Sequence, residues 1–235
     1  MHFPETRWSH VTRSRGREPD ARAALSDLCA GYYEPVFVFL RSEGRRDEDA
    51  RELAQEFFAR LLRGNGVDGA EPERGRFRTF LLGAVKHFLA AQRQYDDRLK
   101  RGGGQTPEPI SIDLSSAPGL EPVDKNVLSP DAAFDRQWAL TVLDRTLAAL
   151  SAEMDTEGRS TLCTALTPFL TGSAEYGRIE SAAPDLGMTP AALRVAVHRL
   201  RSRYRDLLRN ELAHTLAPGI SVEDELAALK AALRG

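Results

Sequence analysis

The feature that most constrains the fold is the stretch DLGMTPAALRVAVHRLRSRYRDLL at residues 185–208, which has the pattern of a tight turn followed by a long helix. Leu186 and Gly187 close a preceding short helix, because glycine adopts the left-handed conformation that a tight turn needs. The hydroxyl of Thr189 can cap the next helix, and Pro190 occupies the first helical position, where a missing N–H costs nothing. The stretch therefore predicts a helix-turn-helix.

The helix after this turn has one apolar face and is otherwise basic. The apolar residues recur at helical spacing and are Leu193, Val197, Leu200, Tyr204 and Leu207. The other faces carry Arg194, His198, Arg199, Arg201, Arg203, Arg205 and Arg209, with Asp206 as the one acid among them. A basic helix alone is also typical of a solvated surface. The turn chemistry, the Thr-Pro cap and the one-sided charge together favour a helix that enters the major groove of DNA.

The composition of the 235-residue chain allows one large domain or two small ones. The net charge is −2, yet residues 74–101 and 194–209 are basic and the C-terminal tail is acidic. Phosphate attraction is screened within about 10 Å, so these local blocks matter more than the total. Cys29 and Cys163 are far apart in apolar helical contexts, which predicts buried, reduced thiols. The sequence has no run of about 18 apolar residues and no signal-peptide core, so we expect a cytoplasmic protein without membrane contact.

Helical periodicity continues through the chain and no segment alternates like a strand, so we expect an all-α fold. Helices are predicted from Pro19, over 36–40, 47–62 and 76–101, from Asp131, over 162–170 and 176–183, through the basic stretch, and after a cap at Ser221. The segment 102–130, with three consecutive glycines and several prolines, is typical of a flexible linker.

These patterns predict two small helical domains joined by a flexible linker. The boundaries that we expect are a first domain at 1–101, the linker at 102–130, a second domain at 131–210 and a C-terminal tail at 211–235. The tail either docks on a partner or packs on the second domain, and packing is the expectation. Trp8 is expected to pack on the first domain.

The segment DEDARELAQEFFARLL at residues 47–62 predicts a well-formed amphipathic helix. Three acids in its first turn carry charge that the helix dipole favours. Its inward face consists of Ala50, Leu53, Ala54, Phe57, Phe58, Leu61 and Leu62. Its outer surface is polar and mostly acidic, with Asp49, Glu52, Gln55 and Glu56.

The predicted helix at 76–101 mixes aromatic and basic residues, a combination that also occurs where single-stranded nucleic acid stacks on aromatic rings. However, Phe77, Phe80 and Phe88 have core spacing, so we expect them to be buried. Lys86 and Arg93 share one face of the helix and are the better nucleic-acid candidates.

The order of these parts resembles an extracytoplasmic-function sigma factor of bacterial RNA polymerase, over most of residues 20–210. The motifs that carry the resemblance are DARELAQEFFARLL, RFRTFL followed by KHFL, and YGRI followed by LGMTPAALRVAVHRLRSRYRDLL. With a tail past the second domain, the chain is similar to the subtype frequent in Planctomycetes-like genomes. The resemblance implies sigma region two in the first domain and sigma region four in the second.

The resemblance also implies three sets of site residues. The surface for the clamp helices of core RNA polymerase corresponds to Asp49, Glu52, Leu53, Gln55, Glu56 and Phe57. The helix that holds the melted minus-ten strand corresponds to Arg78, Lys86, His87, Arg93, Gln94, Lys100 and Arg101. The recognition helix for the minus-thirty-five element corresponds to Thr189, Pro190, Ala191, Arg194, Val195, His198, Arg199, Arg201 and Arg203.

The function that the resemblance implies is that of a sigma factor, which directs polymerase to promoters and is not an enzyme. Its partners are core RNA polymerase and promoter DNA, with an anti-sigma or other regulatory protein as a further candidate, and it needs no metal or cofactor. A helix-turn-helix regulator that never binds polymerase is the alternative, but it leaves the acidic surface of 47–62 without a purpose. A nuclease is disfavoured, because the five histidines are scattered and form no HExxH motif.

Overall fold

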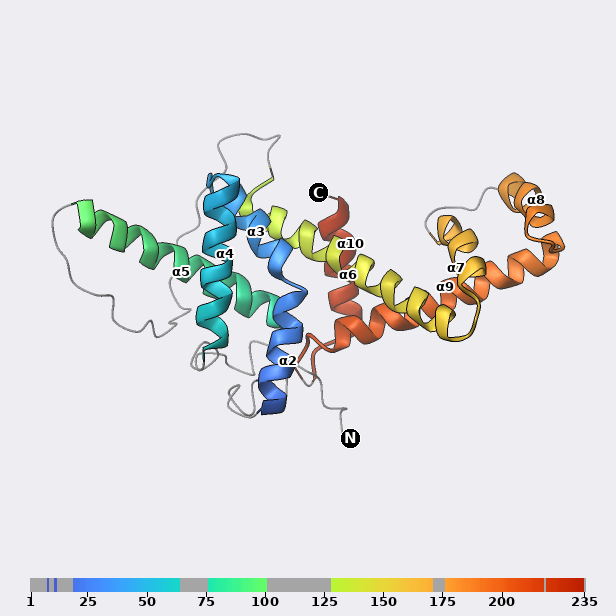
Figure 1. Cartoon of the computed structure of the whole chain (residues 1–235), viewed down its shortest axis with the longest axis horizontal. Helices are drawn as coiled ribbons and strands as arrows, with labels where there is room; N and C mark the ends of the chain where they lie inside the picture. The colour runs from blue at the N-terminus through green and yellow to red at the C-terminus, as the bar shows by residue number, and fades with distance from the viewer. Residues whose placement is uncertain are drawn as a thin grey trace. The chain divides into compact units, whose positions relative to one another are not determined.

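The computed structural model describes Trp8, Val11 and residues 19–63, 76–100, 128–170, 176–217 and 219–234 (Figure 1). Within these residues the protein is all-α, as predicted, and the extended pairing is confined to an isolated bridge between Arg76 and Leu216. The elements are α2 (Pro19–Ala30), α3 (Tyr33–Ser42), α4 (Asp47–Leu62), α5 (Phe77–Lys100), α6 (Pro130–Thr156), α7 (Ser160–Leu166), the 3₁₀ turn η2 (Thr167–Phe169), α8 (Tyr176–Asp185), α9 (Pro190–Ala213) and α10 (Val222–Arg234).

The packing divides the chain into two compact units. The first unit consists of Met1–Thr141 together with Leu212–Gly235, and the second consists of Val142–Glu211. This division differs from the predicted boundaries in two ways, because the first part of α6 and all of the predicted tail except Glu211 belong to the first unit. Most of the predicted linker, residues 102–127, lies outside the described residues.

The first unit has an aromatic core built around α5. Phe77, Phe80 and Phe88 are buried, as the spacing predicted. Trp8 is also buried, with its ring centroid 4.9 Å from that of Phe77 and 5.3 Å from that of Phe80, which confirms that it packs on this part of the chain. The backbone N–H of Trp8 donates to the carbonyl oxygen of His214 over 3.1 Å. The N-terminal segment and the residues after α9 therefore share one core with α5.

The second unit has its own apolar core. Its members come from the second half of α6 and from α7, η2, α8 and α9, and they are Leu150, Met154, Cys163, Leu166, Phe169, Ile179, Ala183, Leu193, Val197 and Leu200. Each of these elements is too short or too polar to bury an apolar face alone, so the shared core holds them together. Cys163 and, in the first unit, Cys29 are both buried free thiols, as predicted.

The C-terminal tail was expected to pack on the second domain, and the structure corrects this expectation. The hydroxyl of Ser221 accepts a hydrogen bond from the N–H of Asp224 over 3.3 Å, so α10 begins at the predicted cap. Two residues of α10 are buried, namely Glu225 and Leu229. Glu225 forms ion pairs with Arg76 and Arg78 of the first unit. The tail is therefore part of the first unit's core.

No helix among the described residues is long and apolar enough to cross a membrane.

Candidate nucleic-acid interface

The turn between α8 and α9 has the geometry that the sequence predicted. Gly187 has a φ of +61°, in the left-handed region that favours glycine. Its N–H donates to the carbonyl oxygen of Pro184 over 3.0 Å, and the N–H of Met188 donates to that of Ala183 over 2.9 Å. These two bonds form a Schellman motif, which satisfies the last carbonyl groups of α8. The helix runs two residues beyond the predicted end at Ala183, because Pro184 lies in the last turn and these bonds close the helix after it.

The start of α9 also matches the prediction. The hydroxyl of Thr189 accepts a hydrogen bond from the N–H of Ala192 over 3.2 Å, and Pro190 is the first helical residue. The cap and the turn fix the direction in which α9 leaves α8. The apolar face of α9 is then held by the core, since Leu193, Val197 and Leu200 are all buried. The helix-turn-helix is therefore a capped unit that is held by a shared core and has a defined outer face.

The outer face of α9 carries short and basic side chains. Its exposed residues in the first half of the helix are Pro190, Ala191, Ala192, Val195, His198 and Arg199, whereas Arg194 is half-buried. Farther along, Arg205 and Arg209 are also exposed. A helix that presents small residues near its N-terminus and arginines beside them can approach DNA closely and bind its phosphates.

Two of the predicted DNA-contacting arginines have partners within the protein. The Nε of Arg201 donates to the carbonyl oxygen of Phe169 over 2.8 Å and so ties α9 to η2. Arg203 donates from Nε and Nη2 to the two carboxylate oxygens of Glu153, over 2.7 and 2.6 Å. These hydrogen bonds from Arg203 lower the pKa of the Glu153 carboxyl. Arg201 and Arg203 thus help to hold the helix-turn-helix together. Their contact with DNA stays a prediction, because the pair of Arg203 with Glu153 is partly exposed to solvent.

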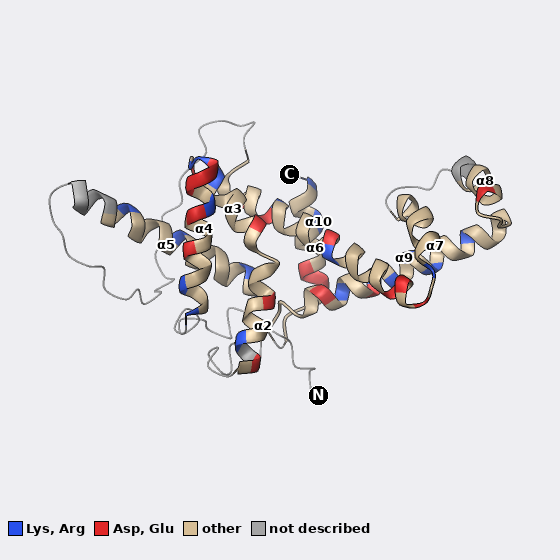
Figure 2. Ribbon diagram, in the orientation of Figure 1, with Lys and Arg blue, Asp and Glu red and all other residues tan. Residues whose placement is uncertain are grey.

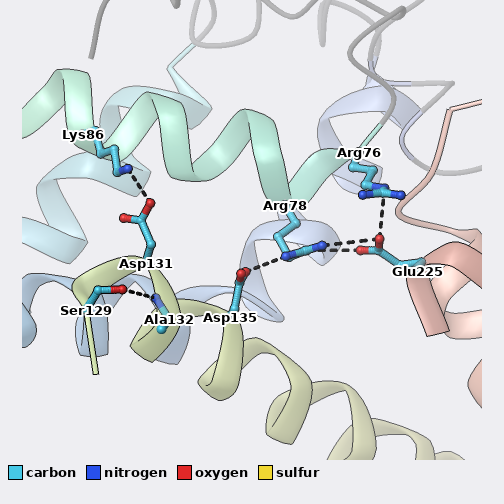
Figure 3. A network of polar contacts seen from close by, with 8 residues as sticks. All are labelled: Arg76, Arg78, Lys86, Ser129, Asp131, Ala132, Asp135 and Glu225. Atoms are coloured by element: carbon cyan, nitrogen blue, oxygen red, sulfur yellow. Dashed lines mark hydrogen bonds and ion pairs between the residues drawn. The ribbon is translucent and has the colours of Figure 1, made fainter. Parts of the chain in front are cut away.

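Two basic residues of α5 that were predicted to contact DNA also have acidic partners, and Figure 3 shows the partner of Lys86. The ammonium group of Lys86 donates to Asp131 over 2.7 Å, and Arg93 donates to Glu43 over 2.6 Å. Both pairs are partly exposed to solvent. Exposed pairs contribute on the order of 1 kcal/mol or less. A phosphate group can therefore compete with either carboxylate for these two cations.

Arg78 was predicted to contact DNA, but its side chain is only 12% exposed. It donates to Asp135 over 2.6 Å and to Glu225 over 3.2 Å, and its guanidinium carbon lies 4.3 Å from the centroid of the Trp138 ring. Figure 3 shows the guanidinium of Arg78 pointing to Asp135 on one side and to Glu225 on the other. Burial opposes the charge of Arg78, but Glu225 and Asp135 more than compensate and raise its pKa. Arg78 therefore joins α5, α6 and α10 and is not part of a DNA surface.

The remaining predicted residues of α5 divide into described and undescribed ones. Gln94 is exposed. His87 is half-buried, and its Nδ1 has no hydrogen-bond partner among the described residues. The side chain of Lys100 and the whole of Arg101 lie outside the described residues.

The helix α4 presents the predicted polar surface, and Figure 2 shows its acidic first turn in red. Glu52 and Gln55 are exposed, Asp49 pairs with Arg46 over 3.2 Å, and Glu56 accepts from Gln92 over 2.9 Å. Leu53 is half-buried between the two faces. Glu52 and Gln55 are thus the most accessible part of the predicted polymerase surface.

Phe57 was predicted both as an inward residue and as a polymerase contact. The structure places it inside, since it is 4% exposed and its ring lies 5.7 Å from the ring of Phe88. The inward prediction is confirmed and the contact prediction is wrong, because the ring is used in the core between α4 and α5.

Three acids that organise this unit were not predicted as site residues, namely Asp131, Asp135 and Glu225. Asp131 and Asp135 are four residues apart at the start of α6, so they share one helix face. That spacing signals an acidic patch, but the sequence does not say which basic residues lie opposite.

The comparisons with protein-family models, curated proteins and solved structures found no match to this chain.

Proposed function

We propose that this chain is a dissociable promoter-specificity subunit of bacterial RNA polymerase, a sigma factor of the extracytoplasmic-function type. It binds core polymerase through α4, and it binds promoter DNA through α9 and through the basic side chains of α5. It acts by binding, not by catalysis, in the cytoplasm where polymerase and template are found. An anti-sigma or other regulatory protein is a further partner under this proposal.

The observation that carries the proposal is the presence, in one chain, of a capped helix-turn-helix and another helix, α4, with an exposed acidic surface. The helix-turn-helix supplies an accessible face with His198 and Arg199 for a duplex. The exposed Glu52 and Gln55 on α4 suit a basic protein surface, where charge complementarity sets the docking rate and the register. Two weak contacts to DNA and one to polymerase, joined in a single chain, reinforce each other through effective concentration.

The proposal is tested by retaining core RNA polymerase on the immobilised full chain. Glu52→Lys reverses a charge at the centre of the exposed surface of α4, so we expect it to weaken retention about three- to tenfold, as for the loss of on the order of 1 kcal/mol. Asp27→Lys on α2 is the matched control, because Asp27 is also exposed and the change in charge is identical. Absence of polymerase binding by the unmodified chain would contradict the proposal.

A helix-turn-helix regulator that does not bind polymerase is the second candidate. It is favoured by one observation, namely that Lys86 and Arg93 of α5 already have acidic partners, so that α9 is the more accessible DNA surface. The polymerase retention assay separates the two candidates, because the regulator binds duplex DNA but gives no signal with polymerase.

A further inference from the structure

The exposed face of the helix-turn-helix carries a large apolar side chain, that of Val195. Successive residues of an α-helix are rotated by about 100°, so Val195 is rotated by about 200° from the buried Leu193. The other core residues of this helix, Val197 and Leu200, cluster on the side of Leu193. Val195 therefore points away from the core, and its side chain is 49% exposed.

The neighbours of Val195 leave room for close approach. Ala191 and Ala192 lie one turn before it, and both are exposed and short. His198 and Arg199 lie one turn after it, and both are exposed. The outer line of the helix thus begins with three small apolar residues and continues with two that can donate hydrogen bonds.

A single exposed valine on a protein surface needs no explanation. The position of Val195 distinguishes it, because it lies in the second turn of a capped helix, opposite the core. The N-terminal residues of the second helix in a helix-turn-helix are those that contact base edges. An apolar group at this point faces a groove in which nearly every other group is a hydrogen-bond donor or acceptor.

The C5-methyl group of thymine is the apolar group that the major groove offers. Contact with an amino group or a carbonyl oxygen would leave that polar group dehydrated and unpaired, which is unfavourable. We propose that Val195, with Ala191 beside it, reads the methyl group of a thymine in the target duplex. This inference deepens the proposed function but uses only its DNA-binding part, so it holds for a sigma factor and for a regulator alike.

The test begins with the selection of duplexes from a random library. One arm uses the full chain alone, and the other uses the full chain together with core RNA polymerase. Each thymine of the selected site is then replaced singly by deoxyuridine, which removes the methyl group and preserves base pairing. We expect one replacement to weaken binding about fourfold, because the burial of one methyl group at the interface is lost. The other thymines serve as internal controls.

The Val195→Ala variant then connects that thymine to the protein. Alanine favours the helix, and Val195 lies outside the apolar core, so the fold is preserved. The variant should bind the thymine and deoxyuridine sites with equal affinity. Leu140→Ala is the control, because it truncates another aliphatic side chain, which is 39% exposed on α6. This control should keep the fourfold difference between the two sites.

Two results would overturn the inference. One is a selected site at which no deoxyuridine replacement weakens binding, and the other is a methyl effect that persists in Val195→Ala. In both cases the duplex is still bound, so the proposed function stands while the inference fails. If neither arm selects any duplex, the proposed function and the inference fail together.

Discussion

Arg78 of α5 and Glu225 of α10 are 147 residues apart in the chain and form a buried ion pair, in which the Nε of Arg78 donates to Oε1 of Glu225 over 3.2 Å. The carboxylate of Glu225 is fully buried, and Arg76 contributes a second contact to it at 3.0 Å. Breaking a buried pair leaves an uncompensated charge in the interior. This pair therefore makes the C-terminal helix α10 a structural part of the first unit.

Replacement of Glu225 should destabilise the first unit. Glu225→Ala leaves Arg76 and Arg78 without their carboxylate, so we expect the free energy of unfolding to fall by about 3 kcal/mol. Both tryptophans of the chain, Trp8 and Trp138, belong to this unit, so urea unfolding followed by tryptophan fluorescence is the measurement. Lys230→Ala, on the exposed side of α10, should change the transition by less than about 0.5 kcal/mol. Equal transitions for the two variants would show that the pair is not stabilising.

Replacement of Gly187 tests the turn of the helix-turn-helix. A Cβ at this position meets no atom within 4 Å, so the penalty of Gly187→Ala comes from the left-handed backbone alone. We expect a loss of about 1 kcal/mol, and a smaller loss for Gly187→Asn, because asparagine tolerates this conformation better. The change should appear in circular dichroism, which follows both units, and leave the tryptophan transition unchanged. A larger loss for asparagine than for alanine would contradict this explanation.

The thiol of Cys29 gives a pH-dependent prediction. Burial raises its pKa from 9.0 to about 12, so the unfolded chain loses the proton first as pH rises. The neutral thiol thus supports the fold below pH 9, and this contribution is lost between pH 9 and 12. We compare the free energy of unfolding of the unmodified protein with that of Cys29→Ala at pH 7 and at pH 10. The difference between the two proteins should shift by about 1 kcal/mol against the unmodified protein at pH 10. A difference between the two proteins that is the same at pH 7 and pH 10 would contradict the burial effect.

Arg199 should contribute affinity for DNA without contributing sequence preference. It is exposed beside Val195, where later residues of a recognition helix bind phosphate. Arg199→Ala should weaken all duplexes alike and reduce the slope of log K against log salt by about one. Arg22→Ala on α2 removes an exposed arginine outside the helix-turn-helix and should leave the slope unchanged. A change in sequence preference in Arg199→Ala would assign a base contact to this residue instead.

The helix-turn-helix could be predicted well because its determinants are local. The conformation of Gly187, the cap at Thr189 and the first helical position of Pro190 depend on residues within one turn of the chain. The apolar spacing of Leu193, Val197 and Leu200 likewise follows from the helical repeat. Each of these features needs no knowledge of distant parts of the chain.

The errors arose where the partner is distant in sequence or lies across a core. The spacing of Phe57 places it on the inward face of α4, and only the resemblance assigned it to the polymerase surface. Its burial against α5 agrees with the spacing. Arg78 has the composition of a surface residue, but Glu225 and Asp135 lie opposite it, and no pattern in the sequence connects the three. The internal partners of Arg201 and Arg203, which are Phe169 and Glu153, are likewise distant in sequence. Basic residues are therefore poorly assigned by sequence alone, because an arginine serves an internal carboxylate as well as a phosphate.

The central claim is that α4 binds core polymerase while α9 selects the DNA. Run-off transcription by core RNA polymerase on fragments of the source genome, with and without the full chain, tests it most directly. The account predicts discrete transcripts that require the chain, that are reduced by Glu52→Lys and by Arg199→Ala, and that persist with Asp27→Lys. The absence of any chain-dependent transcript, from a protein that is folded by circular dichroism, would contradict the claim.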